Sequence, residues 1–210
     1  ERVLPSRGIN YQVLTKILSE FGFSPRLYNL SSVERFSLSK ITPDDELKRF
    51  LHYYVESGIP VAVNLMPKGN NASGHSVVCI GHGKKKEELV KKARRNKWIS
   101  WEHKDTCHPL INSADFYDDY VIIDDNKPVY HVRNFKELSE HTDMEVENIA
   151  VPLYKRMLLD AVDVIAIVRS VLHHEHYGID VWADEFLEPK ENVIFRLFMA
   201  SSHSIKDFRS

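Results

Sequence analysis

Residues 74–81 read GHSVVCIG and residues 120–126 read YVIIDDN, and these two stretches decide the fold. Each is a short apolar run with β-branched residues and a turn signal beside it, which is typical of a buried β-strand. His75 enters the first predicted strand, while Asp124 and Asp125 leave the second. If the two strands pair antiparallel, the start of one lies beside the end of the other. The pattern therefore predicts a histidine and a carboxylate side by side.

Helices and further strands surround these two stretches. Apolar residues recur at helical spacing in residues 8–22, and a second predicted helix begins after the capping residue Thr42 and ends before Gly58. Its expected buried stripe comprises Leu47, Phe50, Leu51, Tyr54 and Val55. The longest helix is expected at residues 154–177, where apolar residues again follow the helical period. We expect further strands at residues 26–30, 59–65, 146–153 and 193–199. Helices and neighbouring antiparallel strands in this order predict an α+β fold with a partial central sheet packed against helices.

Residues 83–118 interrupt this order. They begin with the run KKKEE at residues 84–88 and carry further lysines and arginines up to Lys97, so we interpret them as a basic surface insertion with one helical stretch. Mixed charge without interleaved aromatic residues favours a solvated face over a phosphate-binding one. We expect one domain over residues 1–153 that contains this insertion, and a C-terminal helix and strand extension over residues 154–210 packed on the same domain.

Composition excludes several classes of protein. A chain of 210 residues can bury a core of ordinary size, and its formal net charge of −2 predicts no general attraction to nucleic acid or to anionic membranes. Its apolar runs are all shorter than the roughly 20 residues of a membrane span. Two cysteines do not make a disulfide framework, so we expect a reducing, cytoplasmic compartment. The sequence starts at Glu1 rather than methionine, and we expect a segment upstream of it.

The histidine and the carboxylates match two thirds of a nucleophile–histidine–acid triad. In such a triad the histidine takes a proton from the nucleophile, and the acid holds the imidazole in the correct tautomer. We take His75 as the candidate base and Asp125 as the candidate orienting acid. Asp124 is the alternate acid, because one register step moves the two aspartates onto opposite faces of the sheet. The alternative interpretation is structural: a surface histidine at a strand end and a solvated acidic turn.

These stretches, together with GIPVAVNL at residues 58–65, resemble the papain-like cysteine peptidase superfamily, in particular its bacterial bacteriocin-processing-like branch. The resemblance covers residues 8–130. It implies a papain-like fold and hydrolysis of a peptide or amide bond in a peptide or protein substrate. On this resemblance, His75 takes the role of general base and Asp125 that of the orienting residue. We expect no cofactor and no metal.

The nucleophile is the member of the triad that these stretches do not supply. The resemblance places a cysteine at the start of a helix before residues 8–22, so we expect it upstream of residue 1. Cys79 lies four residues beyond His75 on one predicted strand, ~13 Å away at the strand rise, which excludes it as a direct partner. We interpret Cys79 as a small core residue. Cys107, inside the insertion, stays a candidate. Because neither cysteine matches the expected position, a second hypothesis is open: a non-catalytic peptide- or protein-binding module of the same fold. The sequence leaves the oligomeric state open.

Two other features allow more than one interpretation. The run HHEH at residues 173–176 suggests a metal site, but ligands must converge from one face and neighbours along one helix do so poorly. We therefore interpret these histidines as a helix C-terminus, where positive charge is favourable. Trp98 and Trp101, beside the basic run, are either packing anchors or a contact with a partner.

Overall fold

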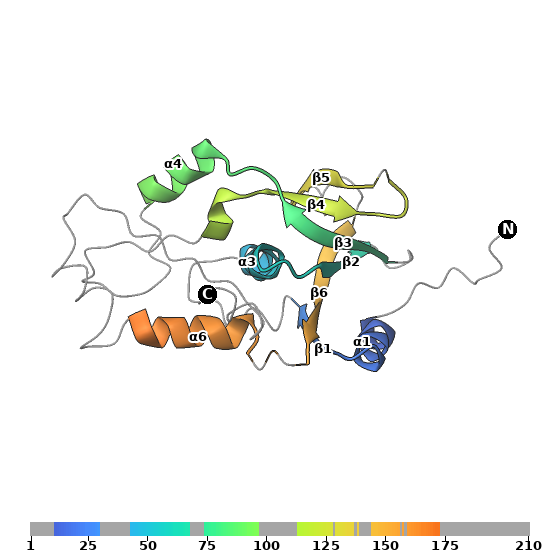
Figure 1. Cartoon of the computed structure of the whole chain (residues 1–210). Helices are drawn as coiled ribbons and strands as arrows, with labels where there is room; N and C mark the ends of the chain where they lie inside the picture. Colours follow the sequence, from blue (N-terminus) through green and yellow to red (C-terminus); the bar gives the residue numbers. More distant parts are fainter. Residues whose placement is uncertain are drawn as a thin grey trace, which may run out of the picture.

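The computed structural model describes residues 11–29, 43–67, 74–96, 113–127, 129–136, 138, 144–155, 157 and 159–172. Its centre is a six-stranded, wholly antiparallel sheet in the order β1-β6-β2-β3-β4-β5 (Figure 1). The strands are β1 (Phe23–Asn29), β2 (Val61–Pro67), β3 (His75–His82), β4 (Asp119–Ile123), β5 (His131–Asn134) and β6 (Met144–Tyr154). The helices are α1 (Tyr11–Glu20), α3 (Pro43–Glu56), α4 (Glu87–Asn96), the 3₁₀ helix η1 (Ser113–Phe116) and α6 (Ala161–Leu172). The predicted α+β class and the antiparallel sheet are confirmed.

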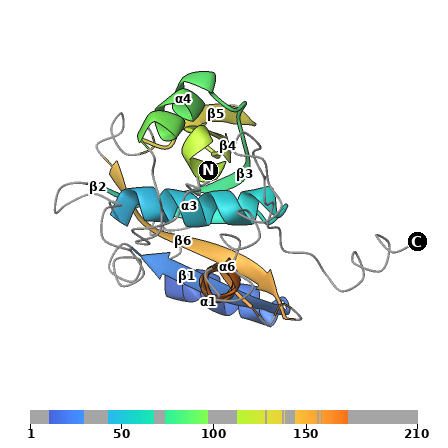
Figure 2. The same cartoon turned by 90° about the vertical axis from the view of Figure 1, so that its left-hand side faces the viewer.

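Helix α3 covers one face of the sheet and forms the core with it. It contacts β2, β3 and β6, and Figure 2 shows it lying across the front of the strands. Its predicted apolar stripe is buried as expected, and comprises Leu47, Phe50, Leu51, Tyr54 and Val55. Helix α1 lies against β1 and β6 on the other side of the sheet from α3 (Figure 1). The sheet is therefore packed between α3 on one face and α1 on the other.

The C-terminus of α3 is fixed by a Schellman motif. Gly58 has a φ of 73°, a conformation that glycine adopts without steric cost. The N–H of Ile59 donates to the carbonyl of Tyr54 (2.9 Å) and the N–H of Gly58 to that of Val55 (3.0 Å), which satisfies the last carbonyls of the helix. The chain then enters β2 at Val61.

The end of the chain differs from the prediction in one helix. The expected helix over residues 154–177 is wrong at its start, because β6 continues to Tyr154 and α6 begins only at Ala161. The side chain of Asp160 accepts hydrogen bonds from the N–H groups of Val162 and Asp163 (both 3.0 Å), and the Asp163 side chain accepts one from Asp160 N–H. This reciprocal cap sets the first turn at that position. The spacing of apolar residues in the sequence does not reveal this start of α6.

Strand β5 is a second difference. It was not expected from the sequence, because four residues that include a histidine, an arginine and an asparagine carry no strand pattern. It pairs with β4, with His131 opposite Ile122. Thr42, the helix start at residues 8–10, the strand at 193–199, the HHEH run at 173–176, Trp98 and Trp101 lie outside the described residues.

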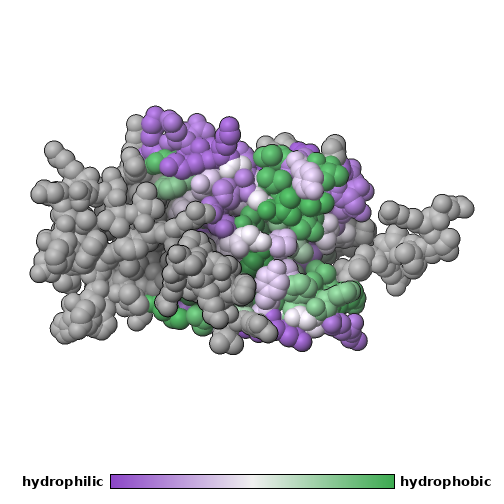
Figure 3. Space-filling view, in the orientation of Figure 1, coloured by the Kyte–Doolittle hydropathy of each residue, from purple (hydrophilic) through white to green (hydrophobic). Residues whose placement is uncertain are grey.

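The insertion at residues 83–118 joins β3 to β4, and its described ends rest on α3. Lys48 pairs with Asp118 (2.6 Å), and Arg49 donates to both carboxylate oxygens of Asp115 (3.1 and 2.9 Å). The expected helical stretch is α4. Figure 3 shows a hydrophilic surface over α4 next to an apolar surface in the region of β3 to β5. Val78 and Ile80 of β3 are both 37% exposed. Among the described helices, none has the length and apolarity to cross a membrane.

Candidate functional site

The register of β3 against β4 decides which side chains meet at the end of these strands. Cys79 pairs with Ile122, and both are fully buried on the face that α3 covers. Side chains alternate along a strand, so His75, four residues before Cys79, and Asp124, two residues after Ile122, extend on that same face. They are diagonal neighbours across the two strands. The prediction that antiparallel pairing brings the histidine and a carboxylate together is confirmed.

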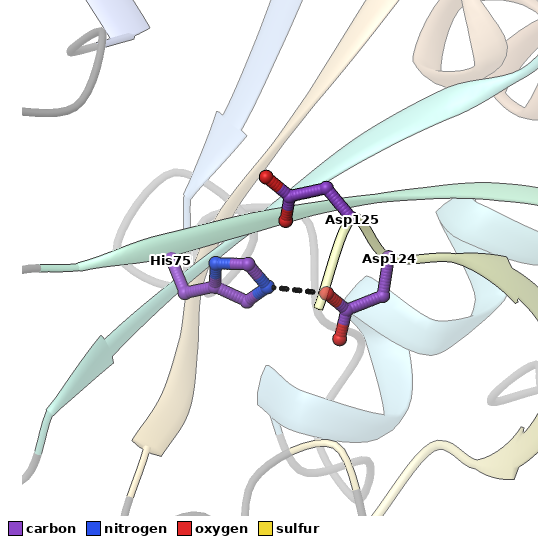
Figure 4. Close-up of side chains that lie close together, drawn as sticks. All are labelled: His75, Asp124 and Asp125. Atoms are coloured by element: carbon purple, nitrogen blue, oxygen red, sulfur yellow. Dashed lines mark hydrogen bonds and ion pairs between the residues drawn. The ribbon is translucent and has the colours of Figure 1, made fainter. Parts of the chain in front are cut away.

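His75 and Asp124 form a hydrogen-bonded pair. The Nε2 atom of His75 lies 2.9 Å from Oδ1 of Asp124, and Figure 4 shows the imidazole edge turned toward this carboxylate. The side chains are 25% and 12% exposed, so the pair is shielded from water without being inaccessible. The backbone N–H of Asn126 also donates to Asp124 Oδ1 (2.9 Å). The carboxylate is thus held by the turn that carries it as well as by the imidazole.

The partner of His75 is therefore Asp124, the alternate residue, and not Asp125, the first choice from the sequence. Asp125 lies one residue further along and is exposed, and Figure 4 shows a hydrogen bond from the His75 ring to the Asp124 carboxylate only, although an oxygen of Asp125 lies within 4.8 Å of both. Among the described residues it has no hydrogen-bond partner. The sequence could not distinguish the two aspartates because each satisfies the pattern equally, and a shift of one residue in the pairing exchanges them.

The surroundings of Asp124 favour its ionised form. Partial burial raises the pKa of this carboxyl, but the hydrogen bonds from Asn126 N–H and from the His75 ring, together with the positive charge of His75 and His131, outweigh burial and lower the pKa below its ordinary value. His131 was missed by the sequence prediction. Its charge acts on Asp124 because β5 pairs His131 with Ile122, two residues before the carboxylate. An ionised acceptor at His75 Nε2 is what a base–acid pair requires.

The described cysteine is not a nucleophile for this pair. Cys79 is fully buried, and burial raises the pKa of its thiol to about 12, against a smaller opposite effect from its hydrogen bond to the Gly81 carbonyl. A thiol with such a pKa is protonated at neutral pH, and it is the thiolate that attacks carbonyl carbon. The prediction that Cys79 is a core residue is confirmed. Cys107 lies outside the described residues.

A row of polar side chains fixes the start of β3 from the opposite face of the sheet. Ser76, directly after His75, donates to the Asn64 side chain (2.7 Å). Asn64 in turn donates to Asn148, and Asn148 donates to Glu147 (3.1 Å). Asn64 and Asn148 are only 9% and 2% exposed, so these bonds satisfy polar groups that burial would otherwise penalise. The row ties β3, β2 and β6 together one residue from the candidate base.

A second group of titratable side chains lies at the other end of β3. His82 Nε2 is 2.9 Å from Glu56, and its ring packs on Tyr117 with the centroids 4.2 Å apart. His52 of α3 stacks on the same tyrosine, is fully buried, and has no hydrogen-bond partner at either ring nitrogen among the described residues. Burial first, and then the charge of His82, lower the pKa of His52 to about 4. We assign this group to the packing of α3 against the ends of the insertion.

One set of side chains in the described part of the chain has the composition of a metal site. A ligand atom of His75, one of Asp124 and one of Asp125 all lie within 4.8 Å of one another. No protein-family model, curated protein or solved structure matches the chain.

Proposed function

We propose that the chain is part of a papain-like cysteine-peptidase-type hydrolase that cleaves peptide or amide bonds, with His75 as general base and Asp124 as the residue that orients it. The observation that carries the proposal is the 2.9 Å contact between His75 Nε2 and Asp124 Oδ1, at the ends of two antiparallel strands. Support comes from the lowered pKa of Asp124, which keeps an ionised acceptor beside the imidazole.

The geometry assigns separate tasks to the two ring nitrogens of His75. When Nε2–H donates to Asp124, Nδ1 carries the lone pair and is the atom that accepts a proton. In the proposed reaction Nδ1 takes the proton of a cysteine thiol, and the thiolate attacks the substrate carbonyl. The imidazolium returns this proton to the leaving amine as the C–N bond breaks, and water hydrolyses the acyl–thioester that remains. Asp124 stabilises the imidazolium throughout.

The nucleophilic cysteine lies outside the described residues in this proposal. Following the family resemblance, we place it on a helix upstream of residue 1, and Cys107 is the alternative within the chain. The test is a thiol-directed activity probe applied to the full-length protein. We expect labelling of one cysteine, slowed about a hundredfold by His75→Ala because the base is lost, and reduced by Asp124→Asn. Asp125→Asn is the matched control, since this exposed carboxylate has no described partner, and it should label like the wild type.

Labelling that His75→Ala leaves unchanged would remove His75 from the mechanism. Labelling that disappears only in Cys107→Ser would identify Cys107 as the nucleophile and place the reaction in the insertion. Mapping the labelled peptide by mass spectrometry separates these outcomes, because a buried Cys79 should stay unmodified in the native protein.

The second candidate is a non-catalytic peptide- or protein-binding module with the same scaffold. The observation that favours it is the inert Cys79: the described residues hold a base and an acid but no reactive thiol. If no cysteine of the full-length protein reacts with the probe above its rate in urea-unfolded protein, the binding module is the better description. A cysteine at the head of a helix in the segment before Glu1, reactive only in folded protein, would reject it.

A further inference from the structure

We propose that His75, Asp124 and Asp125 bind a divalent transition-metal ion, zinc first of all, and that the bound ion switches off the base. Metal binding stands on the geometry alone, whereas the inhibitory effect rests on the proposed hydrolase function. One imidazole nitrogen and two carboxylate oxygens converge at this point, each within 4.8 Å of the other two. Three protein ligands with an open fourth position is a common arrangement for zinc outside purely structural sites.

The distances require little rearrangement. Zinc bonds to nitrogen and oxygen are about 2 Å long, so ligand atoms around it are about 3.3 Å apart in a tetrahedral site. His75 Nε2 and Asp124 Oδ1 already lie 2.9 Å apart. The third ligand, Asp125, is exposed and has no described partner, so its carboxylate can turn toward the pair without breaking another contact. His75 and Asp124 are thus held in place at the strand ends, and the Asp125 side chain turns to supply the third ligand.

Charge favours a cation here. With a neutral imidazole, the three side chains carry two negative charges within a few ångströms of each other. Like charges at this distance repel, and a divalent ion cancels both. The imidazole selects against magnesium and calcium, which prefer all-oxygen shells. The N–H of Asn126, which donates to Asp124 Oδ1, supplies the outer contact that orients a metal-binding carboxylate.

Metal binding and proton transfer use the same atoms. A metal bound at His75 Nε2 would use the lone pair of this nitrogen, so the proton that Nε2 shares with Asp124 would move to Nδ1, and Asp124 would bind the metal instead. Nδ1 would then carry the only proton of the neutral ring and would have no lone pair to accept another. The bound metal therefore blocks the base while leaving any thiol in place.

The experiment is calorimetric titration of the 210-residue chain with zinc chloride, alongside magnesium chloride. We expect one zinc site that His75→Ala abolishes and that Asp125→Asn weakens about tenfold or more, with no comparable magnesium binding. Glu88→Gln, which removes an exposed carboxylate from the first turn of α4, is the matched control and should bind zinc like the wild type. Asp125 is exposed, so its asparagine variant is expected to fold and keeps the test valid if His75→Ala does not.

Equal zinc affinity in the wild type and Asp125→Asn overturns the proposal, and so does zinc binding that other histidines supply and that His75→Ala leaves unchanged. An isotherm without binding overturns it as well. The inhibitory effect is tested separately on the full-length protein: zinc should slow probe labelling of the wild type and have much less effect on Asp125→Asn. Zinc binding without any probe labelling would reject the hydrolase and keep the metal site. Labelling that zinc leaves unchanged would reject the inhibitory effect and keep the hydrolase.

Discussion

His52 shows at the residue scale how α3 meets the insertion. It is a fully buried imidazole stacked on Tyr117 at a centroid distance of 4.9 Å, with neither nitrogen hydrogen-bonded to a described residue. His82 and Lys48 lie near it and add positive charge, while Glu56 opposes them. Burial has the largest effect, and together these groups lower the pKa of His52 to about 4. At neutral pH the folded protein therefore contains a neutral His52.

This buried histidine predicts acid sensitivity. The pKa of His52 is about 4 in the folded state and 6.5 in a model peptide, so the unfolded chain binds the proton more readily between these values. The free energy of unfolding should fall as the pH drops from 6.5 toward 4, by up to about 3 kcal/mol from this group. His52→Phe keeps the stacking and should flatten that fall in urea unfolding curves. His131→Gln is the control and should keep the same fall in stability as the wild type. Equal pH dependence in the wild type and His52→Phe would show that His52 does not cause the fall.

At the scale of single elements, capping residues decide where α3 ends and where α6 begins. Gly58 closes α3 in the left-handed conformation, and the Asp160–Asp163 box opens α6. Ala161, the first residue of α6, also donates its N–H to the Tyr54 hydroxyl (3.0 Å), which in turn hydrogen-bonds the Tyr28 hydroxyl (2.5 Å). These buried polar links join α6, α3 and β1. They lock the relative positions of three elements that are far apart in the sequence.

Gly58→Ala is predicted to destabilise the protein by about 1 kcal/mol or more, because an alanine at a φ of 73° is strained although no atom lies near its Cβ. Gly81→Ala is the matched control. Its added Cβ meets only Val121 at ordinary contact distance (3.6 Å) and its φ is not in the left-handed region, so it should be nearly neutral. Thermal or urea unfolding measures both. A Gly58→Ala variant as stable as Gly81→Ala would show that the turn does not need the left-handed conformation.

At the scale of the whole molecule, ion pairs attach the insertion to α3. Arg49 is 7% exposed and contacts two carboxylates, those of Asp115 and Glu46, the latter 6% exposed. Lys48 reaches Asp118 from the next position on the helix. Removing one partner of a buried pair leaves the other charged and desolvated, which costs more than the pair itself contributes. The attachment of the insertion to α3 thus depends mainly on Arg49.

Arg49→Met should lower the free energy of unfolding by about 2–4 kcal/mol, since it removes a buried cation that contacts Glu46 and Asp115. The comparison is Lys86→Met, which breaks the pair of Lys86 with Asp119 (2.9 Å). Both side chains of that pair are about one third exposed, so the loss should stay below about 1 kcal/mol. Urea unfolding at low and moderate salt distinguishes the two. If both substitutions cost the same small amount, Arg49 is not the anchor of the insertion.

The sequence by itself determined the features that depend on neighbouring residues. Alternating and helical apolar periods predicted β2, β3, β4, β6 and α3, and predicted a histidine and an acidic turn at facing strand ends. These follow from local geometry, because side-chain direction repeats every two residues in a strand and every 3.6 in a helix. The core role of Cys79 follows from the same pattern.

Only the tertiary structure decided what depends on pairing between distant segments. The register that sets Cys79 opposite Ile122 selects Asp124 over Asp125, and a sequence that satisfies both alternatives cannot make that choice. Three other features are also non-local: β6 lies between β1 and β2, strand pairing brings His131 toward Asp124, and His52 is buried against Tyr117. Each is set by the packing of α3 and the sheet as a whole, which is why the sequence specified the kinds of groups in the candidate site but not which of them touch.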